Sequence, residues 1–102
     1  PNATLQVNGS VSAKIRVLSA GTVAEDDYTV LVSGNITMPA AAATNAGRIY
    51  QLILDAAGSF TISGTFRMGG ANSTNYVLSG STNGTNVVVQ SNGTEWVVIS
   101  RD

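Results

Sequence analysis

The sequence predicts an all-β fold, a small β-sandwich or β-prism of about nine short, mainly antiparallel strands. Three observations favour this fold. Apolar and polar residues alternate with a period of two in many short segments, and β-branched residues dominate those segments. Turn-forming Asn and Gly interrupt these segments about every eight to twelve residues. The chain has no long stretch with the apolar spacing of an amphipathic helix.

The first part of the chain contains four predicted strands. Residues 4–7 alternate and end at an Asn-Gly dipeptide, which suits a tight hairpin turn. Residues 11–18 place apolar side chains on one face and polar side chains on the other, as in a half-buried strand. Residues 28–32 and 35–38 predict two further strands. The second of these ends at a proline, which has no N–H to donate to a sheet.

The middle of the chain alternates between loops and short strands. Residues 39–47 carry a run of alanines without apolar periodicity, so they predict a loop or a single helical turn. Residues 49–54 predict a strand that is apolar on both faces. Residues 59–62 predict a short strand, residues 66–70 lead into a polar loop, and residues 76–78 resume an extended segment.

The last two predicted strands are residues 85–90 and 95–100, and residues 91–94 predict the hairpin between them. Within this hairpin, Asn92 and Gly93 suit a type I′ turn. Trp96 follows the turn and can lay its ring over a neighbouring strand. We expect Trp96 to anchor the core, and the alternative is an exposed platform on which a sugar ring stacks.

The composition predicts that identical chains cover part of the apolar surface. Hydrophobic residues make up 43% of the chain and charged residues only 11%, against about 25% charged in a typical domain. Consecutive apolar residues on a strand point to opposite faces, so residues 49–54, 87–89 and 96–99 need cover on both sides. We therefore expect an oligomer of identical chains; the alternative is a central strand that loops cover. The expected core or trimer contacts are Ile49, Leu52, Leu54, Val88, Trp96 and Val98.

Several function classes are disfavoured by composition. The chain contains no Cys and no His, so the usual general base, thiolate nucleophile and zinc ligands are missing. A net charge of −1 does not provide the excess of positive charge that nucleic-acid binding requires. No apolar stretch is close to the length of about 20 residues that a membrane-spanning helix needs. We expect no enzyme, cofactor, metal, nucleic-acid partner or membrane insertion. Because the chain begins with Pro1, we expect an excised or processed domain.

The charged residues are few, and structural roles explain them well. Adjacent residues of an extended chain point apart, so Glu25, Asp26 and Asp27 do not form the facing carboxyl pair of a glycosidase, about 5–10 Å apart. We expect Asp26 and Asp27 to bond nearby backbone amides, with a calcium site as the alternative. Arg48 and Arg67 are expected to snorkel or to pair with an acid at a subunit edge.

Ligand recognition on a β scaffold usually lies in its loops. The longest polar loops that we expect are residues 69–75 and 79–86, whose amides and hydroxyls could pair with sugar hydroxyls. The alternative is that both loops are only solvated turns. The candidate ligand-binding residues are Asn72, Asn75, Asn83 and Asn86.

Five stretches together resemble a known family. Residues 27–32 give an acidic and aromatic start followed by a strand, and residues 36–41 give Met-Pro followed by small residues. Residues 45–50 read Asn-Ala-Gly-Arg-Ile-Tyr, and residues 87–99 close on Ser-Asn-Gly-Thr-Glu-Trp and a strand. Residues 3–10 read Ala-Thr-Leu-Gln-Val-Asn-Gly-Ser. This pattern resembles a β-domain of tailed-bacteriophage tail fibres and related virion appendages.

The resemblance implies a trimeric fibre or spike module without catalytic residues. It implies that residues 1–23 form an N-terminal strand or connector and residues 24–102 the β-domain, within a single compact unit. Family members often carry charges after the position of Tyr50. Here residues 51–54 are apolar or uncharged, which favours a buried position for this strand.

Three functions from different classes follow. The first is a virion structural module of a tail fibre, spike or head fibre, which trimerises, contacts other virion proteins and supports or presents a host-attachment surface. The second is a module at the fibre tip that binds carbohydrate or a host receptor, such as a host-surface glycan. The third is a bacterial surface adhesin domain or an enzyme fragment. The expected location is the virion, with the bacterial cell surface as the alternative.

Overall fold

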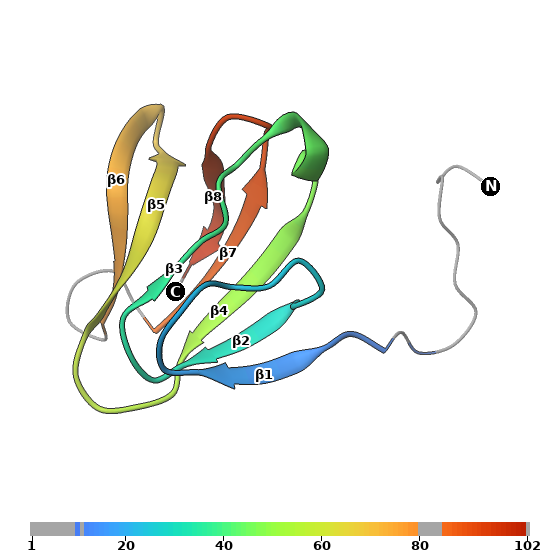
Figure 1. The fold of residues 1–102 in the computed structure, drawn as a ribbon. Coiled ribbons are helices and arrows are strands. Elements are labelled where there is room, and N and C mark those ends of the chain that lie inside the picture. Colours follow the sequence, from blue (N-terminus) through green and yellow to red (C-terminus); the bar gives the residue numbers. More distant parts are fainter. Residues whose placement is uncertain (1–9, 11, 80–84, 102) are drawn as a thin grey trace.

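The computed structural model describes residue 10, residues 12–79 and residues 85–101 of the chain. In these residues it contains eight strands, one 3-10 turn and no α-helix, which confirms the predicted all-β class (Figure 1). The strands are β1 (Ile15–Leu18), β2 (Thr29–Val32), β3 (Ile36–Thr37), β4 (Ile49–Leu54), β5 (Phe60–Met68), β6 (Ala71–Leu78), β7 (Asn86–Ser91) and β8 (Trp96–Arg101), and the turn is η1 (Ala43–Asn45).

All eight strands belong to one sheet, which corrects the predicted arrangement. Their order is β1-β2-β4-β7-β8-β5-β3, and β6 pairs with β5 off this path. The pairs β1–β2, β2–β4, β3–β5 and β5–β8 are parallel, whereas β4–β7, β5–β6 and β7–β8 are antiparallel. The sheet is therefore mixed and not mainly antiparallel, and it curls toward a barrel instead of stacking as a two-sheet sandwich. Alternation within a strand does not report the direction of its neighbour, so the sequence could not reveal these parallel pairs.

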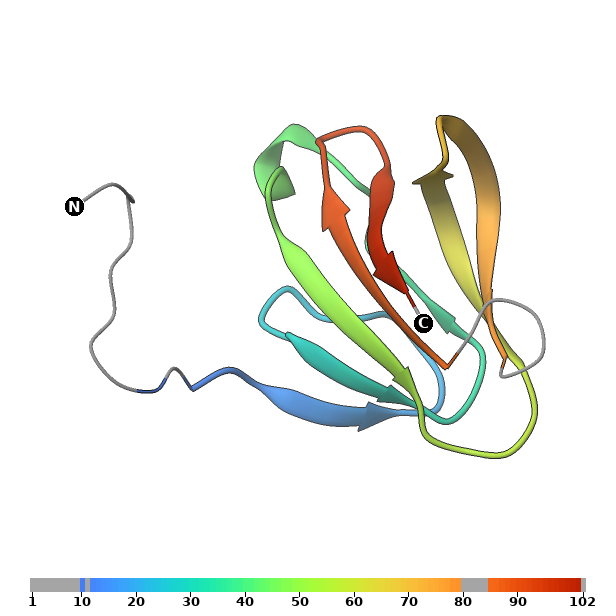
Figure 2. The same ribbon diagram turned by 180° about the vertical axis from the view of Figure 1, so that it is seen from behind.

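The segment after β1 and strand β3 bring the two ends of the sheet together. The Val23 amide donates to the Thr37 carbonyl oxygen, and the Thr37 amide donates to the Gly21 carbonyl oxygen, both at 2.9 Å. Thr22 and Thr37 accordingly form an isolated parallel bridge. Figures 1 and 2 show the resulting nearly closed, barrel-like shape from opposite sides.

Strand β5 changes its partner halfway along its length. Ile62 in the first half pairs with Ile36 of β3, whereas Phe66 in the second half pairs with Trp96 of β8. An irregularity between Ser63 and Phe66 separates the two halves. A bulge of this kind bends a strand and increases its twist, which lets one strand complete two parts of the curved sheet.

The inward side chains of the strands form a single core. Alternation along β2 directs Val30 and Val32 inward, and alternation along β4 does the same for Tyr50 and Leu52. Burial of each large apolar side chain contributes about 1.5–3 kcal/mol. The buried apolar residues are Leu18, Val23, Val30, Val32, Ile36, Met38, Tyr50, Leu52, Ile62, Phe66, Tyr76, Leu78, Val87, Val89 and Trp96.

Several predicted elements are confirmed. The strand predicted at residues 49–54 has the same bounds as β4, and the strand predicted at residues 28–32 differs from β2 by one residue. The single turn expected within residues 39–47 is η1. The final hairpin joins β7 to β8. The strand predicted at residues 4–7 lies outside the described residues, so the described residues do not test the predicted count of about nine strands.

Other elements differ from the prediction. Of the described residues 12–18 in the strand predicted at residues 11–18, only the last four form β1. Residues 60–62 and 66–68 of the two segments predicted at residues 59–62 and 66–70 belong to one long strand, β5. The polar loop expected at residues 69–75 is a tight turn at Gly69 and Gly70, with φ of 63° and 83°, followed directly by β6. Residues 71–75 are all exposed, so polar side chains there reflect solvent contact and not irregular backbone.

The turn between β7 and β8 is not of type I′. Such a turn needs a positive φ at both central residues, but among the described residues only glycines have one, here Gly93 with φ of 95°. The Asn92 side chain forms the turn instead, because its Oδ1 accepts hydrogen bonds from the amides of Thr94 and Glu95, both at 2.9 Å.

Candidate functional site

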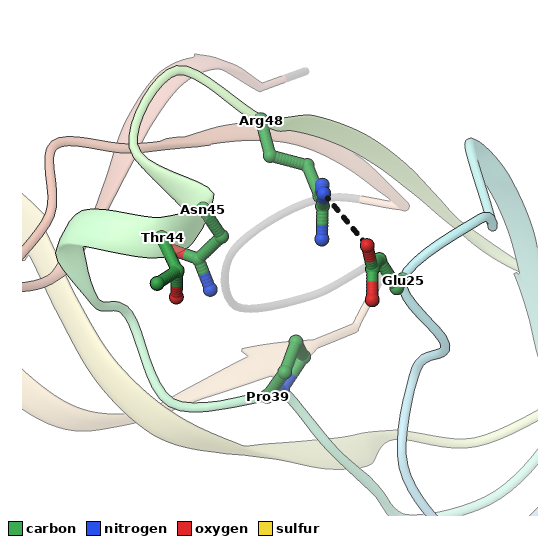
Figure 3. Close-up of a pocket in the computed structure, with 5 residues that line it drawn as sticks. All are labelled: Glu25, Pro39, Thr44, Asn45 and Arg48. Carbon is green, nitrogen blue, oxygen red and sulfur yellow. Dashed lines mark hydrogen bonds and ion pairs between the residues drawn. The ribbon is translucent and has the colours of Figure 1, made fainter.

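A polar pocket of about 200 Å³ lies between the segment that precedes β2 and the segment that joins β3 to β4. Its lining residues are Glu25, Pro39, Thr44, Asn45 and Arg48. Figure 3 shows Arg48 and Glu25 approaching each other on one side, with η1 on the other side and Pro39 below. Residues that are up to 23 positions apart in the chain thus surround one space.

The wall of the pocket formed by η1 is held by the side chain of Asn45. Its Oδ1 accepts hydrogen bonds from the Ala42 amide at 2.9 Å and from the Ser91 hydroxyl at 2.8 Å. Its Nδ2 donates to the Ala40 carbonyl oxygen at 2.9 Å. The Gly47 amide also donates to the Ser91 carbonyl oxygen at 2.7 Å, so β7 holds the end of η1 and the residues that follow it.

The floor of the pocket rests on the core through Trp96. The Trp96 indole Nε1 donates to the Pro39 carbonyl oxygen at 2.8 Å. Its ring packs against that of Tyr50, with ring centroids 5.3 Å apart. Trp96 is only 1% exposed, so the ring lies in the core and presents no face on which a sugar could stack.

The other side of the pocket is tied to the core by Tyr50. The Tyr50 hydroxyl donates to the carbonyl oxygen of Ala24, next to Glu25, at 3.0 Å. Burial raises the pKa of Tyr50, and the charge and hydrogen bonding of Arg48 only partly offset this effect. The phenol therefore stays protonated near neutral pH and remains a donor.

The Arg48 guanidinium and the Glu25 carboxylate form an ion pair across the pocket mouth. Their nearest atoms, Nη2 and Oε1, are 3.5 Å apart. The Glu25 side chain is 83% exposed and the Arg48 side chain 29% exposed. A pair at this distance and exposure is weak, so both groups keep hydrogen-bonding capacity for another molecule.

The other two acids of the cluster are used structurally. The Asp27 carboxylate is fully buried and accepts hydrogen bonds from Arg16 Nε at 3.0 and 3.2 Å and from the Ala24 amide at 2.8 Å. Asp26 is exposed and pairs with Lys14 at 3.2 Å. Burial raises the pKa of Asp27, but these hydrogen bonds and cations outweigh burial and leave the pKa below its ordinary value. Groups of three or more possible metal-ligating residues do not occur among the described residues.

A second candidate site is an apolar patch on the outside of the sheet. Register pairs Val17 of β1 with Leu31 of β2, and Leu31 with Ile53 of β4. Ile15 lies two residues before Val17 on the same face, and Val88 of β7 pairs with Gln51, two residues before Ile53. Val17 is 57% exposed and Ile15 64% exposed, and the other three are half-buried. We call Ile15, Val17, Leu31, Ile53 and Val88 the outer patch.

The residues predicted to form the core or the trimer contacts divide between the two sides of the sheet. Leu52 and Trp96 are buried in the single chain. Leu54 and Val98 are partly buried and pack against the core. Ile49 and Val88 are half-buried on the outer side of the sheet, because they alternate with buried neighbours on β4 and β7.

The structure does not gather the predicted ligand-binding residues into one loop. Asn72 and Asn75 are exposed residues of strand β6, and Asn72 accepts a hydrogen bond from Arg67 at 3.3 Å. Asn86 is the first residue of β7 and pairs with Ile53. Asn83 lies outside the described residues. Two strands that do not pair with each other, β6 and β7, therefore carry the three described residues.

The amino-acid pattern alone did not reveal the pocket. Arg48 was expected to snorkel or to meet an acid at a subunit edge, but it pairs with Glu25 of its own chain. Arg67 similarly approaches Glu95 within 3.9 Å. The pocket depends on the parallel pairing of β2 with β4, which brings Glu25 beside Arg48, and on closure of the sheet, which brings Pro39 to the same space. No local spacing indicates either contact. The only sequence features that could have pointed to the pocket were its polar and cationic residues, which are few in this chain.

No known protein family matches the chain, and no curated protein or solved structure shows significant similarity to it. Within the part of the chain that the structure describes, no helix has the length and apolar character needed to cross a membrane.

Proposed function

We propose that this chain is a non-enzymatic structural module of a virion appendage, which associates with identical chains through the outer patch. The observation that carries the proposal is the exposure of that patch in the single chain. Val17 and Ile15 are more than half exposed, and both continue into the less exposed residues Leu31 and Ile53. Contiguous apolar surface of this kind marks contact sites in soluble proteins.

The position of the outer patch favours a second copy as its occupant. Strand β1 stands at one end of the sheet order, so one of its edges has no strand neighbour in the described part of the chain. An uncovered edge strand with apolar side chains readily pairs with another chain. The whole chain carries a net charge of only −1, so two copies repel each other weakly.

The roles of the acidic residues support a non-enzymatic function. The Asp27 carboxylate is held by Arg16 and by the Ala24 amide, and Glu95 accepts a hydrogen bond from Asn92 at 2.9 Å. Both groups therefore serve the fold. The chain also lacks His and Cys, which supply most general bases and thiol nucleophiles.

The virion setting and the number of three subunits come from the resemblance of residues 27–32, 36–41, 45–50 and 87–99 to tail-fibre domains. In such an assembly, the domain would support or present the surface that attaches to the host. The outer patch would face the other subunits, and the pocket would stay open because none of its lining residues belongs to the outer patch.

Light scattering during size-exclusion chromatography tests the association. We expect the mass of the wild-type chain to be three times the 10.4 kDa of one chain at micromolar concentration. Val17→Lys and Leu31→Lys should reduce the mass to that of a monomer, because a desolvated lysine at the contact is costly. Met68→Lys is the matched control, since Met68 is 39% exposed and does not belong to the outer patch.

A monomeric wild-type chain, or equal masses for all three variants, would contradict association through this patch. The virion setting is tested separately by mass spectrometry of purified particles from the source of the sequence. Peptides of this chain are expected in the particles, and their absence would contradict the setting without affecting the result on association.

A further inference from the structure

We propose that the pocket between Glu25 and Arg48 binds a neutral, polyhydroxylated group of the size of one sugar ring. The proposal goes beyond the structural role and does not depend on self-association, since none of the lining residues belongs to the outer patch. It rests on four properties of the pocket: its volume, its charge balance, its rigid walls and its mixture of polar and apolar lining.

The volume limits the ligand to a small group. The pocket holds about 200 Å³. Sites for drug-sized molecules have about 300–1,000 Å³, so this pocket accommodates one ring and not an extended oligomer. A longer chain of sugars could still bind if a single ring entered the pocket and the remainder stayed in solvent.

The charge balance favours a neutral ligand. Arg48 and Glu25 carry opposite charges 3.5 Å apart, so the pocket mouth has no net charge. An anionic ligand would gain from Arg48 but would be repelled by Glu25, and a cationic ligand would meet the reverse situation. A ligand that both donates and accepts hydrogen bonds can use both residues without displacing either charge.

Hydroxyl groups match the hydrogen-bonding capacity of this pair. The ionised Glu25 carboxylate only accepts hydrogen bonds and has two oxygens, so it can bind two neighbouring hydroxyls. The Arg48 guanidinium only donates and has five N–H groups, so it can bind hydroxyl and ring oxygens. The ring of Pro39, below them in Figure 3, adds apolar surface for the C–H groups of a sugar.

The walls are held in place before any ligand arrives. The Asn45 side chain makes two hydrogen bonds within the wall and one to Ser91 of β7, and Trp96 holds the Pro39 carbonyl oxygen from the core. The Tyr50 hydroxyl holds the backbone next to Glu25. A site that is already ordered loses little conformational entropy on binding, which favours affinity for a small ligand.

The experiment is a titration of the ¹⁵N-labelled chain with methyl α-glucoside, methyl α-galactoside and methyl α-mannoside, followed by NMR. For a site of this size we expect a Kd on the order of 1 mM for at least one of them. The amide shifts should be confined to Glu25 and residues 39–48. Because the ligand is neutral, raising the salt concentration should change the Kd less than twofold.

Substitutions at the pocket mouth test whether the glycoside binds there. Glu25→Gln and Arg48→Gln should each weaken binding at least fivefold, while Arg67→Gln is the matched control and should leave the Kd unchanged. Should Arg48→Gln fail to fold, Glu25→Gln remains decisive, because the Glu25 side chain is 83% exposed and its loss does not disturb the core.

Three outcomes would overturn the proposal. The first is the absence of shifts at the pocket with all three glycosides. The second is shifts that map elsewhere, for instance to Asn72 and Asn75 of β6. The third is salt-sensitive binding of glucuronate or sialic acid without binding of the neutral glycosides, which would indicate an anion site at Arg48 alone.

Discussion

The indole Nε1 of Trp96 donates a hydrogen bond of 2.8 Å to the carbonyl oxygen of Pro39, 57 residues earlier in the chain. Trp96 begins β8, and Pro39 follows β3 almost directly. This bond therefore connects two strands that do not pair with each other but that both pair with β5. It also joins the core to the pocket, because Pro39 lines the pocket.

Removing the donor while keeping an aromatic ring should lower stability. Trp96→Phe leaves the Pro39 carbonyl without its partner, and we expect the free energy of unfolding to fall by about 1–3 kcal/mol in urea denaturation. Trp96→Ala also creates a cavity and should cost about 3–5 kcal/mol. Ile99→Ala, at a residue that is 49% exposed, is the control and should change stability by less than about 0.5 kcal/mol. Equal effects of Trp96→Ala and Ile99→Ala would contradict a core role for Trp96.

The buried carboxylate of Asp27 should matter more than its neighbour Asp26. Asp27→Asn weakens charge-assisted hydrogen bonds with Arg16, and we expect a loss of about 1–3 kcal/mol in the free energy of unfolding. Asp26 is 73% exposed and pairs with the partly exposed Lys14. Asp26→Asn should therefore cost less than about 1 kcal/mol. If both substitutions have the same effect, burial does not distinguish these acids.

The stability of the chain should decrease at acid pH through Asp27. Its pKa in the folded state lies below the ordinary value, so the unfolded chain takes up a proton at this group at a higher pH than the folded chain. The contribution of Asp27 is thus present above its unfolded pKa of about 3.9 and is lost as the pH falls through the lower folded value. Urea midpoints between neutral and acid pH should fall less steeply in Asp27→Asn than in the wild type. Parallel curves would argue against this linkage.

Close backbone contact should make Gly34 intolerant of a side chain. A Cβ at this position would overlap with the carbonyl group of Ser19, whose carbon would lie only 2.9 Å away. The backbone must therefore shift, and we expect Gly34→Ala to cost about 3 kcal/mol or more. At Gly58, where φ is +106° but the surrounding space is open, Gly58→Ala should cost only about 1–2 kcal/mol. Thermal denaturation of both variants checks this order, and the reverse order would contradict it.

The asparagines of β6 should contribute little to the fold. Asn72 and Asn75 are exposed, so Asn72→Ala and Asn75→Ala should each change the free energy of unfolding by less than about 0.5 kcal/mol. Their predicted role in ligand binding can then be measured on folded protein, by adsorption of the variants to host cells. Reduced adsorption at unchanged stability would support that role, and unchanged adsorption would exclude it for these two residues.

The sequence by itself determined the all-β class and the positions of most central strands. Period-two alternation and β-branched residues act over a few neighbouring positions, so the bounds of β4 and the turn before it could be read locally. The exposed polar arm of β6 was mistaken for a loop, because Asn, Ser and Thr occur both in loops and on fully exposed strands.

Only the tertiary structure decided how the strands pair and where the pocket lies. Parallel pairing of β1, β2 and β4 follows from chain crossovers, which leave no periodic trace in the sequence. Parallel pairing of β2 with β4 places Glu25 beside Arg48, and the contact of Val23 with Thr37, which closes the sheet, brings Pro39 to the same pocket. Both are contacts between distant residues, which depend on the combined packing of all the strands and not on the residues on either side of each position.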